Sequence, residues 1–400
     1  MMWEKVKLGD ICKYVTSGGT PKSSIKEYYE PKQIPWLKTK EVNYCRIYET
    51  ESYISKDGLD NSSAKMIPQN SVIVAMYGQG DTAGRVAINK IPLTTNQACC
   101  NLIIDETKAC YEFVYYQLVT LYEKMVSLKN GGAQPNLNAA IIKSMEIKLP
   151  PLKTQRYIAD ILSSYDNLIE NNQKQIKLLK EAAQRLYKEW FVDLRFPGHE
   201  NTKIVDGVPE GWQWCKVRDV ADINSSALPK NYKEDFIDYV DLGSVRCGHI
   251  ETRTRYNLNE APGRAKRCAK DGDIIWGMVR PNLKAYALVT NPKETDVFST
   301  GFAVLSAKKV PYSYLYCAVT QEEFVGYLVN ATNGAAYPAV KPVHFEVADI
   351  LKPDDKVLEQ FHSVADLIFR KIEMLDKQNH NLSEARDLLL PKLMNGEVEV

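Results

Sequence analysis

Apolar residues follow two different patterns, which alternate twice along the chain. From Tyr165 to Trp190 they recur at alternating steps of four and three residues, which is the heptad spacing of a coiled-coil helix. The same spacing returns from Ile368 to Leu393. Each stretch predicts an amphipathic helix of about 36 residues, on the order of 55 Å long at ~1.5 Å per residue.

Ahead of each heptad stretch lie short apolar segments separated by Gly, Pro, Asn and Asp. SVIVAM, RVAI and CCNLII belong to the first such region, and DIIWGM and AYALV to the second. Short apolar runs between turn residues are typical of β-strands. A longer stretch at 111–128 predicts a helix. Both regions therefore predict mixed α/β domains of the α+β class.

The two halves of the chain are copies of one unit. NGGAQPNL at 130–137 returns as NGAAYPAV at 333–340, and IPWLKTKEV at 34–42 pairs with IDYVDLGSV at 237–245. An offset of 203 residues held across most of the chain indicates a duplicated unit of about 200 residues. We predict two globular domains, each followed by a long helix, with the two helices packed as an antiparallel coiled coil.

The expected boundaries follow from this repeat. The first globular domain spans 1–150, its helix 151–193, the linker and second globular domain 194–352, and the second helix 353–400. Residues 196–214 are rich in Gly, Pro and Asp. That composition predicts a linker and turn region without strand or helix.

Composition excludes several classes of protein. With 44% hydrophobic residues and a mean hydropathy of −0.33, the 400-residue chain is not predominantly disordered. No apolar run is long enough to span a membrane, and the charged start lacks the pattern of a signal peptide, so we expect a cytoplasmic protein. The nine cysteines and five histidines lack the spacing of disulfide frameworks or metal sites. We expect the cysteines to be small buried hydrophobic residues and no metal to be bound.

Charge is balanced globally and basic locally. The formal net charge is +1, yet residues 246–284 contain nine Lys/Arg against four acids, and residues 1–46 contain nine against five. Focused basic character suits a partner with phosphate groups. An ordinary solvated surface explains either region equally well.

No catalytic motif is present in the sequence. There is no Walker A sequence, no G-x-S-x-G and no N-P-P-[YFW] loop of adenine methyltransferases. GQGDTAG at 78–84 lies between two predicted strands, so we interpret it as a turn and not as a cofactor loop. The chain is expected to be non-catalytic and to bind no cofactor.

Loops rich in Gly, Ser, Thr, Asn and Lys occur at matching places in both halves. DNA-binding proteins use Lys and Arg for phosphates and Asn, Gln or Arg for base edges. One such loop alone is more often an ordinary turn, but its repetition favours nucleic-acid binding. The candidate DNA-binding residues are Thr20, Lys38, Lys40, Gln79, Arg85, Asn96, Gln97, Gln134, Lys230, Arg246, Arg264, Lys266, Arg280, Asn282, Lys284 and Tyr337.

The heptad positions also predict how the two helices pair. A centred antiparallel register places Asn172 opposite Arg386, and a shift by one heptad places it opposite Asn379. The centred register buries about two more apolar residues, ~3–5 kcal/mol, whereas an amide pair contributes ~0.5–1.5 kcal/mol, so we expect the centred one. The candidate spacer residues are Ile169, Asn172, Ile176, Leu179, Leu186, Ile372, Leu375, Asn379, Leu382 and Leu389.

This arrangement resembles the specificity subunits of type I restriction–modification systems, over essentially the whole chain. The helix entry PPLKTQRYIADILSSYDNLIENN (150–172) looks like the central conserved region of that family. The ending ARDLLLPKLMNGEV (385–398) and its looser partner YKEWFVDLRFPG (187–198) are also similar. The second half departs at 353–361, where PDDKVLEQF replaces the PPL-x-x-Q form, and this leaves the start of its helix open.

The resemblance implies that each globular unit is a target recognition domain for one half of a split double-stranded DNA sequence. Duplicated readers would see half-sites about one helical turn (~34–36 Å) apart, with the helices as a spacer. Two modification subunits would bring S-adenosylmethionine, and restriction subunits would add ATP- and magnesium-dependent cleavage. The alternative that stays open is a structural coiled-coil tether between two ligand- or protein-binding domains.

Overall fold

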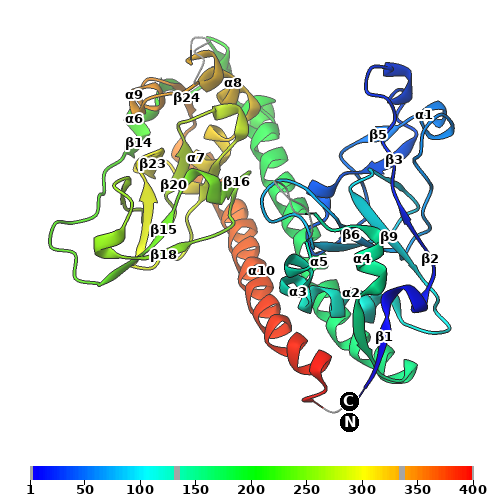
Figure 1. Cartoon of the computed structure of the whole chain (residues 1–400). Coiled ribbons are helices and arrows are strands. Elements are labelled where there is room, and N and C mark those ends of the chain that lie inside the picture. Colours follow the sequence, from blue (N-terminus) through cyan, green and yellow to red (C-terminus); the bar gives the residue numbers. More distant parts are fainter. Residues whose placement is uncertain (1–2, 130–135, 333–337, 399–400) are drawn as a thin grey trace. The chain divides into compact units, whose positions relative to one another are not determined.

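The chain divides into two compact units, and the division cuts through both long helices. The computed structural model describes residues 3–129, 136–332 and 338–398 (Figure 1). One unit comprises Met1–Glu170 with Asn379–Val400, and the other comprises Asn171–Gln378. The long helices are α5 (Leu152–Tyr187) and α10 (Asp355–Asn395). Each unit therefore contains one globular part together with a portion of each long helix.

The globular part of the first unit is built on a five-stranded sheet of order β2-β9-β6-β7-β4 and a three-stranded sheet of order β5-β3-β8. The internal strand β9 is buried along its whole length, as its mostly apolar sequence predicts. The strands are β2 (Cys12–Ser17), β3 (Ile34–Leu37), β4 (Cys45–Ile47), β5 (Tyr53–Ile54), β6 (Val72–Ala75), β7 (Val86–Asn89), β8 (Thr94–Thr95) and β9 (Cys99–Ile104).

Helices α2 and α3 pack between the five-stranded sheet and α5 (Figure 1). The helix predicted at 111–128 is present but breaks at Leu121. A two-stranded sheet joins the start of the chain to the segment before α5. These elements are α1 (Lys56–Asp60), α2 (Tyr111–Thr120), α3 (Tyr122–Ser127), α4 (Ala139–Ser144), β1 (Glu4–Lys7) and β10 (Glu146–Leu149).

The second unit repeats this topology, which confirms the internal repeat. Its sheets have the orders β14-β23-β20-β21 and β18-β15-β22-β19. Equivalent central strands even keep the same register: Val72 pairs with Leu102, and Ile274 pairs with Leu305. The strands are β13 (Gln213–Lys216), β14 (Ala221–Ile223), β15 (Phe236–Val240), β16 (Val245–Arg246), β17 (His249–Ile250), β18 (Thr254–Asn257), β19 (Ala265–Arg267), β20 (Ile274–Gly277), β21 (Tyr286–Leu288), β22 (Asp296–Ser299), β23 (Phe302–Ala307) and β24 (Asp349–Lys352); the helices are α6 (Val217–Val220), α7 (Tyr312–Val319), α8 (Glu322–Asn330) and α9 (Pro342–Glu346).

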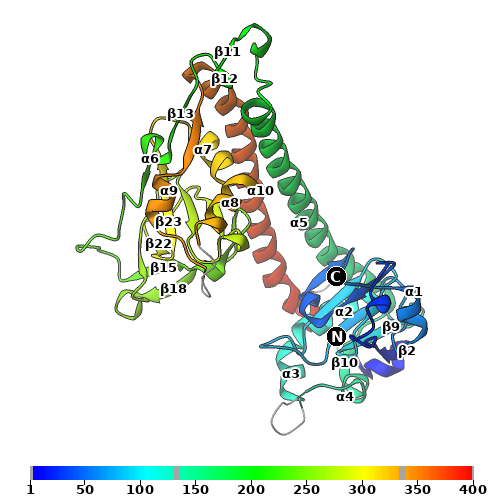
Figure 2. The same ribbon diagram turned by 90° about the horizontal axis from the view of Figure 1, so that it is seen from above.

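The segment 196–214 is more ordered than its composition predicts. Strands β11 (Ile204–Val205) and β12 (Val208–Pro209) form a small hairpin (Figure 2). The expectation of no strand there was wrong. Asp206 and Gly207 both have positive φ, as the two central residues of a type I′ hairpin turn require.

The long helices pair antiparallel, as predicted. In the first unit Ile158 and Leu162, near the start of α5, share a core with Leu393, near the end of α10. In the second unit Ala183 shares a core with Phe361. All ten predicted spacer residues are buried or half-buried.

The predicted register of these helices was wrong. Asn172 donates a hydrogen bond to the Gln378 side chain at 3.5 Å, and Arg386 contacts Asp166 at 2.6 Å. Both contacts correspond to the register shifted by one heptad. Apolar overlap favours the centred register, but in the shifted register the carboxylate of Asp166 compensates the charge of Arg386. A charge in a helix seam needs such a partner.

Helix α10 begins 203 residues after α5 does, despite its different entry sequence. Asp354 caps the N-terminus of α10. Its carboxylate accepts hydrogen bonds from the Val357 N–H at 3.0 Å and from the indole of Trp212 at 3.1 Å. A carboxylate at a helix N-terminus satisfies a free N–H. The departure at 353–361 therefore leaves the helix start unchanged.

All nine cysteines are free. Cys99, Cys100 and Cys317 are buried as expected, but Cys247 is exposed and the others are half-buried. Within residues 3–129, 136–332 and 338–398, no helix has the length and apolar character to cross a membrane. The same residues contain no cluster of three or more His, Cys, Asp or Glu suited to a metal ion.

Candidate nucleic-acid interface

Several candidate residues of the first unit meet where two parallel strands end. Strands β3 and β8 run parallel, with Trp36 opposite Thr94, so the residues that follow them, Lys38 and Asn96, lie at the same edge. The Asn96 N–H donates to the Leu37 carbonyl at 2.9 Å. The loop after β2 joins them, since the Thr20 hydroxyl bonds to the Gln97 side chain. Thr20, Lys38, Asn96 and Gln97 therefore form one polar group.

The other two candidate cations of the first unit, Arg85 and Lys40, contact neighbouring side chains. The Arg85 guanidinium contacts Asp81 at 2.6 Å and Asn43 at 2.9 Å. Lys40 forms an ion pair with Glu51. Gln79 is exposed in the loop that carries Arg85. These pairs lie at the surface, where an ion pair is weak and a phosphate can replace the carboxylate.

In the second unit, two candidates line one surface hollow and two more lie in the loop that borders it. Arg246 and Arg280 line it, and Asn282 and Lys284 belong to the same loop as Arg280. The N–H of Cys247 donates to the Lys284 carbonyl at 2.9 Å, which ties this loop to the β16–β17 turn. The structure thus brings together side chains from 246 and from 280–284.

Arg264, Lys266 and Lys230 form a second group. Lys266 lies on β19, and its carbonyl accepts a hydrogen bond from the Leu228 N–H at 3.0 Å. All three side chains are exposed. Gln134 and Tyr337, also candidates, lie outside the described residues.

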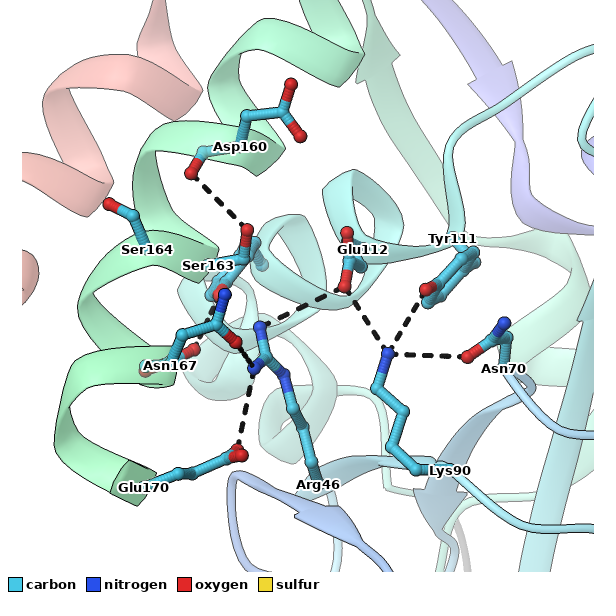
Figure 3. A network of polar contacts seen from close by, with 12 residues as sticks. Arg46, Asn70, Lys90, Tyr111, Glu112, Asp160, Ser163, Ser164, Asn167 and Glu170 are labelled. Atoms are coloured by element: carbon cyan, nitrogen blue, oxygen red, sulfur yellow. Dashed lines mark hydrogen bonds and ion pairs between the residues drawn. The ribbon is translucent and has the colours of Figure 1, made fainter. Parts of the chain in front are cut away.

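Sequence reasoning missed the network that holds the first globular part on α5. Figure 3 shows Arg46, from β4, pointing at side chains of α5. Its guanidinium contacts Asn167 at 2.5 Å and Glu170 at 3.5 Å, and it lies 3.9 Å from Glu112 on α2. Lys90 adds a second cation, 3.4 Å from the Glu112 carboxylate.

The central side chain of this network is buried, so its ion pairs are shielded from solvent. The Arg46 side chain is 5% exposed. Burial works against its charge, but the surrounding acidic groups outweigh burial and raise the pKa of Arg46. No sequence signal identified this residue, because its partners lie more than 60 residues away in the chain.

Replacing Arg46 with alanine is expected to lower the free energy of unfolding of the first unit by about 2–3 kcal/mol, because Glu170 and Asn167 lose a buried charged donor. Chemical denaturation would measure this change. Arg185→Ala is the control, since that side chain is 83% exposed and meets Glu181 at 3.9 Å; it should cost under ~1 kcal/mol. Equal effects in the two variants would contradict an anchoring role.

The second unit is anchored to its helices by different side chains. The Tyr312 hydroxyl donates to Asp366 of α10 at 2.5 Å, and Lys180 of α5 donates to the Gly248 carbonyl at 3.0 Å. Burial lowers the pKa of Lys180, although Asp376 opposes that shift. Each globular part is therefore fixed to long-helix residues of its own unit.

Comparisons with known proteins agree on one family. A profile described as the type I restriction modification DNA specificity domain matches residues 2–181. The MjaIX specificity subunit of Methanocaldococcus jannaschii, a type I restriction enzyme subunit, is 30% identical and aligns over 100% of this chain and 94% of its own length. The HindI specificity subunit of Haemophilus influenzae is 21% identical over 99% of both chains.

A solved structure supports the fold. The crystal structure of a type I restriction–modification S subunit from M. genitalium superposes with a TM-score of 0.61, at 16% identity, over 98% of this chain and 96% of that one. The likeness extends over both globular parts and both long helices. The full-length relative, 30% identical over the whole chain, shows that this chain belongs to the family of type I restriction enzyme specificity subunits.

Proposed function

We propose that this chain is the DNA-reading subunit of a type I restriction–modification complex and recognises a bipartite target. Residues 1–150 would form its first target recognition domain, and residues 194–352 the linker and the second. The observation that carries the proposal is the repeated topology, which presents polar and basic side chains from corresponding loops of both units. Duplicated readers suit a target made of two half-sites.

The long helices, 151–193 and 353–400, would separate the two readers. Their inner faces are lined by the predicted spacer residues, which are buried or half-buried. Each globular part is bonded to these helices, through Arg46 in the first unit and Tyr312 in the second. Such bonds support a fixed attachment of each reader to the spacer.

We further propose that the chain is non-catalytic by itself and works in the cytoplasm with partner subunits. Two modification subunits would supply S-adenosylmethionine, and restriction subunits would supply ATP- and magnesium-dependent cleavage. Apolar side chains on the outer faces of the long helices support docking there, because exposed apolar surface marks protein interfaces. These are Tyr157, Leu168 and Leu388 in the first unit, and Leu178, Val364, Leu367 and Met374 in the second.

Binding to a randomised duplex pool tests the proposal. The full-length chain, assembled with the modification subunits encoded beside its gene, should enrich one bipartite sequence. Binding that depends on salt but not on sequence, or no binding at all, would favour a structural tether and contradict the proposal.

Alanine at the candidate cations is expected to weaken binding to all sequences alike. Wherever Arg246, Arg280, Lys284, Lys38, Lys40 or Arg85 neutralises a phosphate, its removal should reduce the salt dependence of the binding constant by about one in the log–log slope. Titrations of the assembled complex at several salt concentrations measure this slope. Unchanged affinity in all six variants would mean that the DNA-facing surface lies elsewhere.

A further inference from the structure

The loop between β20 and β21 has a backbone conformation that its residues rarely adopt. Arg280 has φ 49° and ψ 67°, and Lys284 has φ 54° and ψ 43°. Both lie in the left-handed region, which is unfavourable for residues with a Cβ atom. Cys247, which bonds to this loop, has φ 41°. Strain of this kind persists only where the surroundings fix it, and it is concentrated at functional sites.

Hydrogen bonds and an ion pair fix this loop. The Arg280 N–H donates to the Pro338 carbonyl at 2.8 Å, and the Lys284 ammonium lies 2.5 Å from the Glu322 carboxylate. The Lys284 carbonyl accepts the N–H of Cys247. Pro281 is buried and adds its own rigid φ. The loop is therefore preorganised before any partner arrives.

The side chains between the two strained positions point outward. Asn282 is exposed, and Leu283 is 59% exposed. Beside them lies the surface hollow whose walls are apolar, from Leu242, Val279 and Leu283, with Arg246 at its rim. A rigid loop thus presents one amide and one apolar side chain, flanked by cations.

The first unit shows that the fold does not require this strain. Its equivalent loop, between β6 and β7, has positive φ at Gly80 and Gly84, where the absence of a Cβ removes the penalty. Glycine would serve the backbone equally well at 280 and 284. The second unit therefore retains charged side chains at a conformational cost, which points to a role for those side chains.

We propose that residues 280–284, here termed the finger, enter a groove of the half-site read by the second unit, and that Asn282 and Leu283 determine specificity there. This inference rests on the proposed function. The Asn amide offers a donor and an acceptor side by side, as adenine requires in the major groove. Leucine offers an apolar surface for a thymine methyl group, while Arg246 and Arg280 suit the flanking phosphates.

The chain contains a matched control for this test. Asn257 and Leu258 form the same dipeptide at another short helical turn of the second unit, and both are exposed. The variants are Asn282→Ala and Leu283→Ala, with Asn257→Ala and Leu258→Ala as controls. Asn282→Asp is a further variant that keeps the side-chain shape but loses the amide donor.

The assay is selection from a randomised duplex pool by the full-length chain assembled with its modification subunits. The finger variants should lose preference at one or two adjacent base pairs of one half-site, with about 5- to 100-fold weaker binding to the wild-type sequence. The controls should keep the wild-type sequence. Thermal melting of each complex separates these effects from misfolding. If Asn282→Ala fails to fold, Asn282→Asp tests the role of the Asn282 amide in its place.

Three results would overturn the inference. They are an unchanged consensus in the finger variants, a uniform loss of affinity for all sequences, and the same change in the controls. If the wild-type complex itself enriches no sequence, the proposed function fails, and that outcome is distinct from the other three.

Discussion

Exchanging residues 224–340 for the corresponding segment of another specificity subunit is expected to change one half of the recognised sequence and leave the other half intact. The segment begins directly after β14 and ends one residue short of α9. It carries most of the strands of the second unit and all of the candidate cations of that unit. Each mismatched base pair costs ~1–3 kcal/mol, so a change at several base pairs alters preference by a factor of about 1,000 or more.

Methylation sequencing of DNA from cells that contain the chimera and its modification subunits would measure this result. The reciprocal exchange of residues 12–137, which contain β2 to β9, should change the other half-site and serves as its control. A chimera that assembles but alters both half-sites would contradict the assignment of one reader to each unit.

The fold could be predicted because its signals are local and occur twice. The heptad spacing from Tyr165 to Trp190 marks a helix wherever the rest of the chain lies. SVIVAM and DIIWGM, which occupy matching places in the two halves, contain the fully buried strands β6 and β20. A short apolar run alone can belong to a strand or to a buried helix. When the same run recurs at a fixed offset, the two copies can be interpreted together, and the choice is less ambiguous.

For the candidate DNA-binding site, the sequence predicts which loops carry the polar residues but not which of these loops lie close together. Lys38 and Asn96 meet because β3 and β8 pair in parallel, and these strands are about 58 residues apart. Nothing in either loop encodes that pairing. The strained backbone at Arg280 was equally hidden, because its N–H bonds to the carbonyl of Pro338, which lies 58 residues further along the chain.

The register of the helices depended on one interaction that the pattern does not contain. Arg386 occupies a heptad position, where an apolar residue is expected and a charged one is unfavourable. In the folded chain its guanidinium meets Asp166 at 2.6 Å, and the Tyr116 hydroxyl donates to the same carboxylate at 2.5 Å. Burial, followed by the charge of Asp166, raises the pKa of Tyr116 well above its usual range. A buried polar group of this kind can select one register over another.

Replacing Arg386 with alanine is expected to lower the free energy of unfolding of the first unit by about 3 kcal/mol. The Asp166 side chain is only 13% exposed, and a carboxylate left there without its cation carries most of the desolvation penalty. Replacing both partners, with Arg386→Met and Asp166→Leu, should recover part of that stability, because no uncompensated charge then remains, although the buried Tyr116 hydroxyl loses its acceptor.

The second unit provides a matched control for this prediction. Tyr312, Asp366 and Arg370 form the same trio of side chains, but Arg370 is 71% exposed. Arg370→Ala should cost under ~1 kcal/mol, as exposed pairs within one helix do. Denaturation curves for the three variants measure the differences. If Arg386→Ala costs no more than Arg370→Ala, the ion pair with Asp166 does not fix the register, and apolar packing along the seam must do so alone.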